Sequence, residues 1–297
     1  MANPETLIPE LYLVKAFTEQ PNGGNTAGVV LFADRLSHER RQKIAAMLGL
    51  SETAFVSASE VGDVKVEFYT PLKQIPHCGH ATVAAFSLLW QKGLLLNGSA
   101  VKESIDGTRQ ISFEEGKVYQ AQLPPQYTPI AAAGIKPHLI STALGLPAGF
   151  NFPAMPLIAS TGVPFLLVPI PDEATLHHLQ PDQELIRAVS DKAGLVGFYA
   201  FTTATQGADA SARMFAPSYG IPEESATGMA AGPLACYLHD HLKQHKASFL
   251  IHQGYLMRHP SPSQIEVMLQ LDGEGNIMGL RAGGNGLVIR KMELGDF

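Results

Sequence analysis

The feature that most constrains this chain of 297 residues is an internal repeat. Residues 71–85 (PLKQIPHCGHATVAA) return 146 positions later as residues 217–231 (PSYGIPEESATGMAA), with proline at the first and sixth positions of both copies. Residues 51–59 (SETAFVSAS) and 197–205 (GFYAFTTAT) match at the same offset of 146. Because this offset is close to the usual size of one domain, about 150 residues, the repeat predicts two related domains.

The composition is that of a globular protein, with 45% hydrophobic and 16% charged residues. The net charge is −6 and no run of Lys and Arg is interleaved with aromatic residues, which argues against a nucleic-acid partner. No apolar run approaches the roughly 20 residues that span a bilayer, and the N-terminus lacks the pattern of a signal peptide. With only two cysteines, Cys78 and Cys236, the chain is expected in the cytoplasm, without a membrane partner or a disulfide framework.

Two segments predict helices that have no solvent face. The first begins near His80 and runs through small and apolar residues to Trp90, and the second runs from about Thr227 through Tyr237. A helix that is apolar on every side has to be enclosed, so each is expected to lie inside a curled sheet. Pro233 is expected to kink the second helix or to tighten its first turn.

Alternating and continuous apolar runs predict the strands of these sheets. Further helices are expected from Ser37 to Leu48, from about His138, and from Asp182 to Ala193. The fold class is therefore α+β, with two pseudo-symmetric domains that each form a mixed sheet. The predicted strands are 11–17, 28–32, 51–57, 64–69, a hairpin within 101–123, 154–159, 163–170, 197–205, 212–216, 248–252, 264–271, 277–281 and 285–289.

The proline-rich segment 124–137 predicts the boundary between the two domains. The N-terminal domain is expected to comprise residues 1–127, with residues 282–297 returning to it to close its sheet. The C-terminal domain is expected to comprise residues 128–281, and the active site is expected in the cleft between the domains.

Each of the two enclosed helices starts at a glycine-containing turn. Free N–H groups and the positive end of the helix dipole predict a site for a small anion there, most naturally a carboxylate, although shared packing alone would also explain the pattern. The two copies agree in scaffold residues and differ in polar ones, which is typical of a site to which each half supplies different groups. The offset of 146 places Glu52 over Phe198, Cys78 over Glu224 and His80 over Ala226.

The polar residues of the repeat are candidates for acid–base chemistry. Glu52 lies among apolar neighbours and suits a general acid or base, although a carboxylate at an exposed strand end is the alternative. His80 is expected to be neutral at a helix start, where it could hold or pass a proton. Glu224 suits the positive helix end, as a cap or as a functional acid, and Cys78 is expected to be a buried small residue rather than a nucleophile.

No metal or cofactor is predicted. His239, His241 and His245 lack an evident third ligand, and a solvated helix face is their expected place. The chain has no glycine-rich nucleotide-binding motif and no nucleophile elbow, so nicotinamide, nucleotide triphosphate and serine-hydrolase chemistry lack their signatures.

Taken together, these motifs resemble those of the PhzF-like isomerases of phenazine biosynthesis. The resemblance implies a diaminopimelate epimerase-like fold, in which each domain is a mixed sheet curled into a barrel around a central helix. It also implies a cofactor-independent enzyme that forms a homodimer. The matching segments are Asn25 after its glycines, SETAF at 51–55, FYTP at 68–71, CGHAT at 78–82, ATG at 226–228, and Gln253-Gly254 with Arg258.

The resemblance also assigns roles. Glu52 would be the main proton shuttle, His80 would line the site, and Glu224 would replace the acidic residue of an Asp-Pro-x-Thr-Gly-Ser motif, which here also has Ser225 for Pro and Met229 for the last Ser. A carboxylate moved by one carbon, up to about 1.5 Å, argues against activity on the phenazine precursor. The expected substrate-binding residues are Asn25, Ser51, Cys78, Gly79, Thr227, Gly228 and Met229.

The expected function is the movement of a proton within a small carboxylate-bearing substrate. The alternative is a catalytically inactive member of the fold that binds a small ligand or acts as a scaffold. Epimerases of this fold use a cysteine from each domain, and because the repeat places Cys78 over Glu224, a mechanism with two thiols is not expected.

Overall fold

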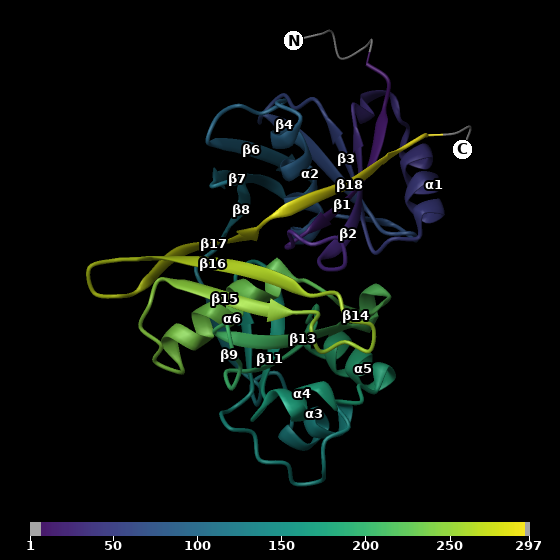
Figure 1. Ribbon diagram of the computed structural model, residues 1–297. Helices are drawn as coiled ribbons and strands as arrows, with labels where there is room; N and C mark the ends of the chain where they lie inside the picture. The colour runs from purple at the N-terminus through teal and green to yellow at the C-terminus, as the bar shows by residue number, and fades with distance from the viewer. Residues whose placement is uncertain (1–6, 295–297) are drawn as a thin grey trace. The chain divides into compact units, whose positions relative to one another are not determined.

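The computed structural model describes residues 7–294, which form two compact units. One unit consists of residues up to 121 together with residues 283–294, and the other consists of residues 122–282. Figure 1 labels most of the helices and strands of each unit. Within the described range, none of the helices combines the length and the hydropathy that a bilayer crossing requires.

The first unit contains a mixed sheet with the strand order β18-β1-β2-β3-β4-β6-β7-β8. Neighbours are antiparallel, except that β2 is parallel to β3 and β4 is parallel to β6. The short strand β5 pairs with the end of β4. The bounds are β1 (Glu10–Ala16), β2 (Asn25–Leu31), β3 (Thr53–Ser57), β4 (Val64–Tyr69), β5 (Gln74–Ile75), β6 (Ser99–Ser104), β7 (Gly107–Glu114), β8 (Lys117–Gln122) and β18 (Gly286–Met292).

The second unit repeats this plan with the strand order β9-β10-β11-β12-β13-β15-β16. Here β11 is parallel to β12 and β13 is parallel to β15, and the short strand β14 pairs with β13. The same succession of pairings in both units establishes the duplication that the sequence repeat predicts. The bounds are β9 (Gln126–Pro129), β10 (Leu157–Ser160), β11 (Pro164–Pro169), β12 (Gly197–Thr202), β13 (Ala210–Ala216), β14 (Ile221–Glu224), β15 (Ser248–Gln253), β16 (Ser263–Leu271) and β17 (Ile277–Gly284).

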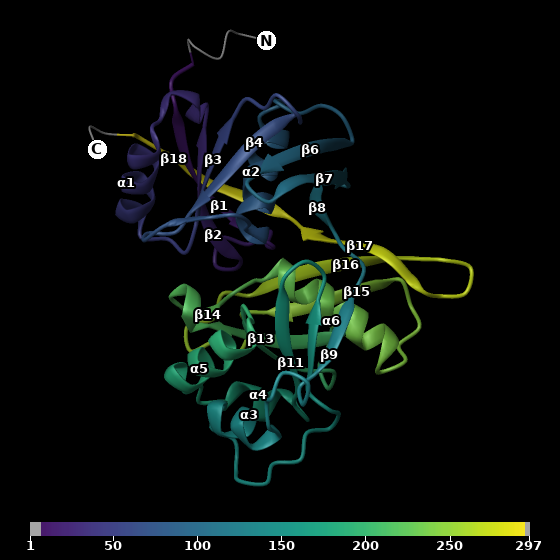
Figure 2. The same ribbon diagram turned by 180° about the vertical axis from the view of Figure 1, so that it is seen from behind.

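Each unit has one enclosed helix, α2 (Gly79–Gln91) in the first and α6 (Gly228–Asp240) in the second. Both views place α2 among the strands of its own unit and α6 among the strands of the other (Figures 1 and 2). Every residue of α2 from His80 to Leu89 is buried, as the all-round apolar pattern predicts. In α6 the N–H groups of Ala230 and Ala231 both donate to the carbonyl of Thr227, which is the tight first turn expected near Pro233.

The outer helices cover the opposite faces of the sheets. The helix α1 (His38–Leu48) is capped by the Ser37 hydroxyl and ends at Gly49 in the left-handed conformation, as predicted. It encloses a small apolar core that includes Ile44 and Phe55. The helix α5 (Gln183–Ala193) is capped by Asp182 and packs with α3 (Pro137–Ala143) and α4 (Glu173–His177) over the outer face of β12.

The expected fold is confirmed, while several local features differ from prediction. The segment 124–137 is not a plain linker, because β9 lies within it and pairs with β10. The helix α4 and the short strands β5 and β14 were not expected. These elements span two to five residues each, too few to show a hydrophobic period in the sequence.

Candidate active site

Three buried side chains of the first unit meet at the start of α2. Glu52 directly precedes β3, Cys78 is the N-cap of α2, and His80 is the second residue of that helix. His80 Nε2 lies 3.4 Å from Glu52 Oε2, and His80 Nδ1 lies 3.5 Å from Cys78 Sγ. Only 5% of Glu52 and 3% of His80 are exposed, so the carboxylate and the imidazole face each other away from bulk solvent.

Backbone contacts fix this cluster in place. The N–H of Gly28 in β2 donates to the carbonyl of Glu52 at 3.3 Å, which extends the parallel ladder of β2 and β3 to the site. The Thr82 hydroxyl donates to the carbonyl of Cys78 at 2.6 Å and holds the first turn of α2. These contacts hold Glu52, before β3, and His80, in the first turn of α2, with little freedom. Groups that transfer protons require such fixed positions.

His80 is neutral at ordinary pH. Complete burial lowers its pKa, and the nearby Glu52 carboxylate only partly opposes this effect. Its place at the positive end of the α2 dipole also disfavours the imidazolium. A neutral imidazole has one ring nitrogen that can accept a proton and one that can donate a hydrogen bond. His80 can therefore take up a proton from the adjacent Glu52 without first being deprotonated itself.

Two further predicted residues lie at the same end of the sheet. Asn25 begins β2 and is 7% exposed, and Ser51 directly precedes Glu52. Because β2 and β3 are parallel, with Gly28 opposite Thr53, Asn25 and Ser51 lie at the amino ends of neighbouring strands. The turn before Asn25 requires glycine, since Gly24 has a φ of 80° and a Cβ there would lie 2.4 Å from Thr18 Cγ2.

The second unit holds its own polar cluster at the start of α6. Glu224 ends β14 and is 8% exposed, and Thr227 is the N-cap of α6. The Thr227 hydroxyl donates to Glu224 Oε2 at 3.0 Å, so the carboxylate is oriented from the helix start. Gly228 is the first helical residue, and Met229 follows it as the only incompletely buried residue between Gly228 and His239.

Gln253 organises this second cluster, although sequence reasoning gave it no role. Its Oε1 accepts from the Thr227 N–H at 3.0 Å and from the Tyr199 hydroxyl at 2.9 Å. Its Nε2 donates to the carbonyl of Glu224 at 2.7 Å and to Thr227 Oγ1 at 3.1 Å. Burial and the charge of Glu224 raise the pKa of Tyr199, which therefore stays a hydroxyl donor. The sequence holds one signal for a buried polar partner of this kind. Tyr199 lies in a predicted buried strand, and a buried tyrosine hydroxyl needs a hydrogen-bond partner.

Replacing Gln253 by Met is expected to lower the free energy of unfolding of the second unit by about 3 kcal/mol. The substitution keeps the volume but leaves the Tyr199 hydroxyl and the Thr227 N–H without the oxygen that accepts from them, and each buried group left unpaired costs about 1–3 kcal/mol. Urea unfolding measures the loss, with Gln264→Met on the exposed face of β16 as the matched control. Equal midpoints for the two variants would show that the hydrogen bonds of Gln253 are not needed.

The structure corrects the residue pairing of the repeat near the helices. Gly79 and Gly228 both begin their helix, which makes the offset there 149 instead of 146, because the hairpin of β13 and β14 is three residues longer than that of β4 and β5. The counterpart of Cys78 is therefore Thr227, not Glu224, and the counterpart of His80 is Met229, not Ala226. A second thiol is still absent at the equivalent position.

The counterpart of Glu52 is also one position away from the predicted Phe198. Phe198 pairs with Phe215 as Thr53 pairs with Tyr69, and Phe215 stands where Tyr69 stands in the repeated strand. The counterpart of Glu52 is thus Gly197, and Phe198 belongs to the outer core beneath α5. The conclusion that the two halves carry different polar groups is unaffected.

Glu52, Cys78 and His80 are also close enough to be considered as metal ligands, with one ligand atom of each within 4.8 Å of the others. The two ring nitrogens of His80 face different partners, Nδ1 toward Cys78 and Nε2 toward Glu52. A single ion bound to one nitrogen would have to draw in the residue from the other side of the ring. The arrangement fits a chain of proton-carrying groups better than one ion.

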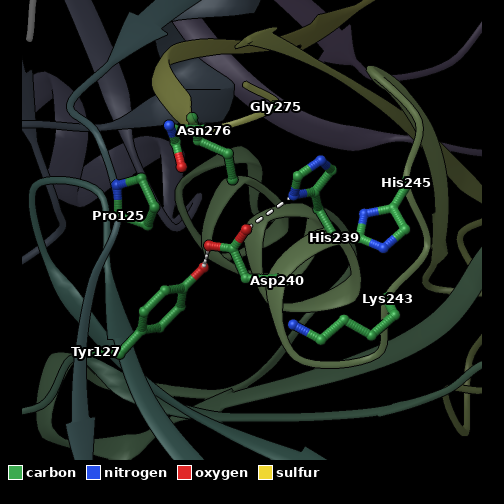
Figure 3. Close-up of a pocket in the computed structure, with 9 residues that line it drawn as sticks. Pro125, Tyr127, His239, Asp240, Lys243, His245, Gly275 and Asn276 are labelled. Carbon is green, nitrogen blue, oxygen red and sulfur yellow. Dashed lines mark hydrogen bonds and ion pairs between the residues drawn. The ribbon is translucent and has the colours of Figure 1, made fainter. Parts of the chain in front are cut away.

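The histidines at the far end of α6 have structural partners. Tyr127 donates to one oxygen of Asp240 and His239 Nδ1 lies 2.8 Å from the other, beside a cavity of about 410 Å³ (Figure 3). His245 contacts the His239 ring edge-on, while His241 stacks on Tyr237. None of the predicted site residues lines this cavity, and its Tyr–Asp–His network ties β9 to the end of α6.

The duplicated fold, in which each unit encloses one helix in a mixed sheet, is that of an epimerase-like class of proteins. The chain belongs to the phenazine biosynthesis-like (PhzC-PhzF) protein family, whose model matches residues 14–288.

Relatives and solved structures agree with this family. The chain is 35% identical over 262 residues to the uncharacterized isomerase YddE of Escherichia coli K12, covering 84% of each chain. It is 32% identical over 235 residues to the trans-2,3-dihydro-3-hydroxyanthranilate isomerase of Pseudomonas aeruginosa PAO1, covering 77% of this chain and 79% of that one. A PhzF-family protein from Bacillus anthracis superimposes with a TM-score of 0.86 at 25% identity, over 97% of this chain and 99% of the other.

Proposed function

We propose that this protein is a cofactor-independent isomerase that moves a proton within a small carboxylate-bearing substrate. The observation that carries the proposal is the buried pair of Glu52 and His80, 3.4 Å apart at the first turn of α2. A carboxylate next to a neutral imidazole can accept a proton from a carbon acid and return it elsewhere.

The proposed reaction conserves atoms and electrons. Glu52 removes a proton as one C–H bond breaks, and the electron pair enters the conjugated system of the substrate. The protonated acid, or His80 in exchange with it, then delivers a proton to a different carbon, where a new C–H bond forms. Backbone N–H groups at the start of α2, near Gly79, would hold the substrate carboxylate and stabilise charge that develops on it.

Glu224 is proposed to act on the same substrate as a third charged or proton-relaying group. Its carboxylate is buried and oriented by Thr227, which supports a defined role. The remaining expected binding residues, Asn25, Ser51, Cys78, Gly228 and Met229, are proposed to line the same site. The family resemblance further leads us to expect a homodimer in the cytoplasm, which sedimentation and cell fractionation would test.

The second candidate is a protein that binds a small carboxylate without turning it over. The replacements at Glu224, Ser225 and Met229 favour this alternative, since they alter the length and the surroundings of the acidic group in the second unit. Ligand binding alone therefore does not distinguish the two candidates.

Solvent-hydrogen exchange does distinguish them. The protein is incubated in D2O with a panel of small carboxylates. The panel includes trans-2,3-dihydro-3-hydroxyanthranilate, the compound that appears in the name of the Pseudomonas aeruginosa relative. The isomerase is expected to introduce deuterium at carbon in at least one compound, detected by mass spectrometry and proton NMR. Saturable binding of a panel member with no deuterium at carbon would overturn the isomerase in favour of the binding protein.

A further inference from the structure

The first unit buries a lysine completely. Lys102 in β6 has an exposed fraction of 0%, and the alternate residues Ala100 and Ser104 are buried with it, so its side chain faces the enclosed side of the sheet. Lysine is almost never fully buried unless a carboxylate pairs with it. Among the described residues, no carboxylate lies within ion-pair distance of Lys102.

Neutral groups hold the ammonium instead. Lys102 Nζ donates to Gln120 Oε1 at 2.8 Å and to Thr82 Oγ1 at 3.2 Å, and it lies 5.1 Å from the centroid of the Phe68 ring. The Thr82 hydroxyl in turn donates to the carbonyl of Cys78 at 2.6 Å. One chain of hydrogen bonds thus links the lysine to the N-cap of α2, two residues before His80.

The second unit shows that the fold does not require a lysine at this position. Lys102 lies opposite Val64 in the parallel pair of β4 and β6, and its counterpart opposite Ala210 is Ile251, which is 0% exposed. Counting from the helix starts, the counterpart of Thr82 is Ala231. The same place in the duplicated fold is therefore filled by two apolar side chains, so packing alone does not account for the polar pair.

Burial and three nearby ionisable groups set the pKa of Lys102. Burial is the main influence and lowers the pKa of Lys102 to about 7, while Asp106 and Cys78 raise it and Arg109 lowers it. The pKa of His77, which contacts Gln120, is lowered to about 3, first by burial and then by the charge of Lys102. As the pH falls through about 7, Lys102 therefore takes up a proton well before His77 does.

We propose that Lys102 is an electrostatic positioning residue of the α2 site, whose buried ammonium fixes the first turn of the helix and adds positive charge beneath it for a substrate carboxylate. The inference deepens the proposed function and rests on it, because it assigns the anion-binding strength of the site to a residue that does not contact the substrate. The positive end of the α2 dipole and the ammonium below it act in the same direction.

The test uses Cys78 as a reporter of the local potential, which requires no known substrate. Iodoacetate carries a carboxylate and iodoacetamide is neutral, so the ratio of their alkylation rates at Cys78 measures the attraction for an anion at the start of α2. Peptide mass spectrometry follows Cys78, which is 8% exposed, and Cys236, which is 0% exposed, serves as the internal reference. Lys102→Met is the test variant, and Ile251→Met, at the equivalent position, is the matched control.

In the wild type the ratio is expected to fall as the pH rises through about 7, because Lys102 then loses its charge. Lys102→Met is expected to lower the ratio about tenfold at roughly pH 6 and to abolish its dependence on pH over this range. Ile251→Met should leave both unchanged. An unchanged ratio in Lys102→Met would overturn the proposal, whereas absence of deuterium exchange by the wild type would overturn only the proposed reaction.

Stability gives an independent readout with a defined sign. The pKa of Lys102 is lower in the folded protein, about 7, than its usual 10.5, so the unfolded chain binds more protons in this window and stability rises with pH. The melting temperature of Lys102→Met relative to wild type is therefore expected to fall by roughly 3 °C per unit from about pH 7 to 9. A difference that stayed constant from pH 7 to 9 would show that folded Lys102 keeps its proton there and that its pKa is not lowered. A difference that kept changing below pH 7 would show that Lys102 is already neutral there, which would contradict the buried ammonium.

Discussion

Replacing Glu52 by Gln is expected to lower the rate of solvent-hydrogen exchange into a cognate carboxylate about a thousandfold and to leave the fold intact. An amide has nearly the shape of the carboxylate but cannot take up the proton, and a positioned acid or base contributes roughly a hundredfold to ten-thousandfold to a rate. Because Glu52 is 5% exposed and faces His80, the replacement also removes a buried carboxylate, which itself costs free energy to bury.

The experiment compares initial rates of deuterium incorporation with melting temperatures measured by circular dichroism. Glu103→Gln is the matched control, since Glu103 is a partly buried carboxylate on β6 of the same unit that accepts a hydrogen bond from Ser59. This control should keep its exchange rate within about twofold. If Glu52→Gln retained a tenth or more of the wild-type rate, another residue would have to be the base.

The fold could be predicted because its strongest signals are local. The all-round apolar character of 80–90 and of 227–237 requires an enclosure, and the repeat supplies two of them. Duplication then implies the same order of strand pairings in both units, while the order itself comes from the structure. By contrast, β9 contains two positions next to proline and forms only by pairing with the distant β10, a contact that no pattern within 124–137 reveals.

The site residues could be named from the sequence, but their counterparts across the repeat could not. Prolines at matching positions support an ungapped alignment, yet nine residues separate the paired Met214 and Glu224 where only six separate Phe68 and Ile75. Only the strand register and the helix starts show that Cys78 corresponds to Thr227. The correspondence between residues of the two halves depends on the hydrogen-bond register between strands, which the residue pattern does not encode.

Lys102 illustrates a signal that was present in the sequence and ambiguous. In Ala100-Val101-Lys102-Glu103-Ser104 the alternation fits either face of a sheet, and the apolar Val101 favours the face on which Lys102 would be exposed. The structure selects the opposite face, with Lys102 buried and Val101 partly exposed. A one-residue change of register reverses every side chain, so this choice depends on pairing with β4 rather than on local preference.

The asymmetry between the two halves has a steric origin at Gly197, the counterpart of Glu52. A Cβ on Gly197 would lie 2.1 Å from the carbonyl oxygen of Phe215 and 3.0 Å from Ala216 Cα. Both are backbone atoms of the neighbouring strand β13, so no side-chain rotation relieves the contact. The second unit therefore has no room for any side chain where the first carries its acid, and its buried carboxylate, Glu224, comes from β14 instead.

Gly197→Ala is accordingly expected to lower the free energy of unfolding of the second unit by about 3 kcal/mol, the upper range for forcing an extra carbon into a packed core. The loss arises because β12 has to move away from β13, which strains the ladder from Phe198 to Thr202. Urea denaturation measures it against Gly273→Ala, where a Cβ meets no atom within 4 Å. The control should change the midpoint little. If Gly197→Ala had the same midpoint as the control, β12 would be able to shift away from β13 at no cost. The backbone would then not be the reason that this position lacks an acid.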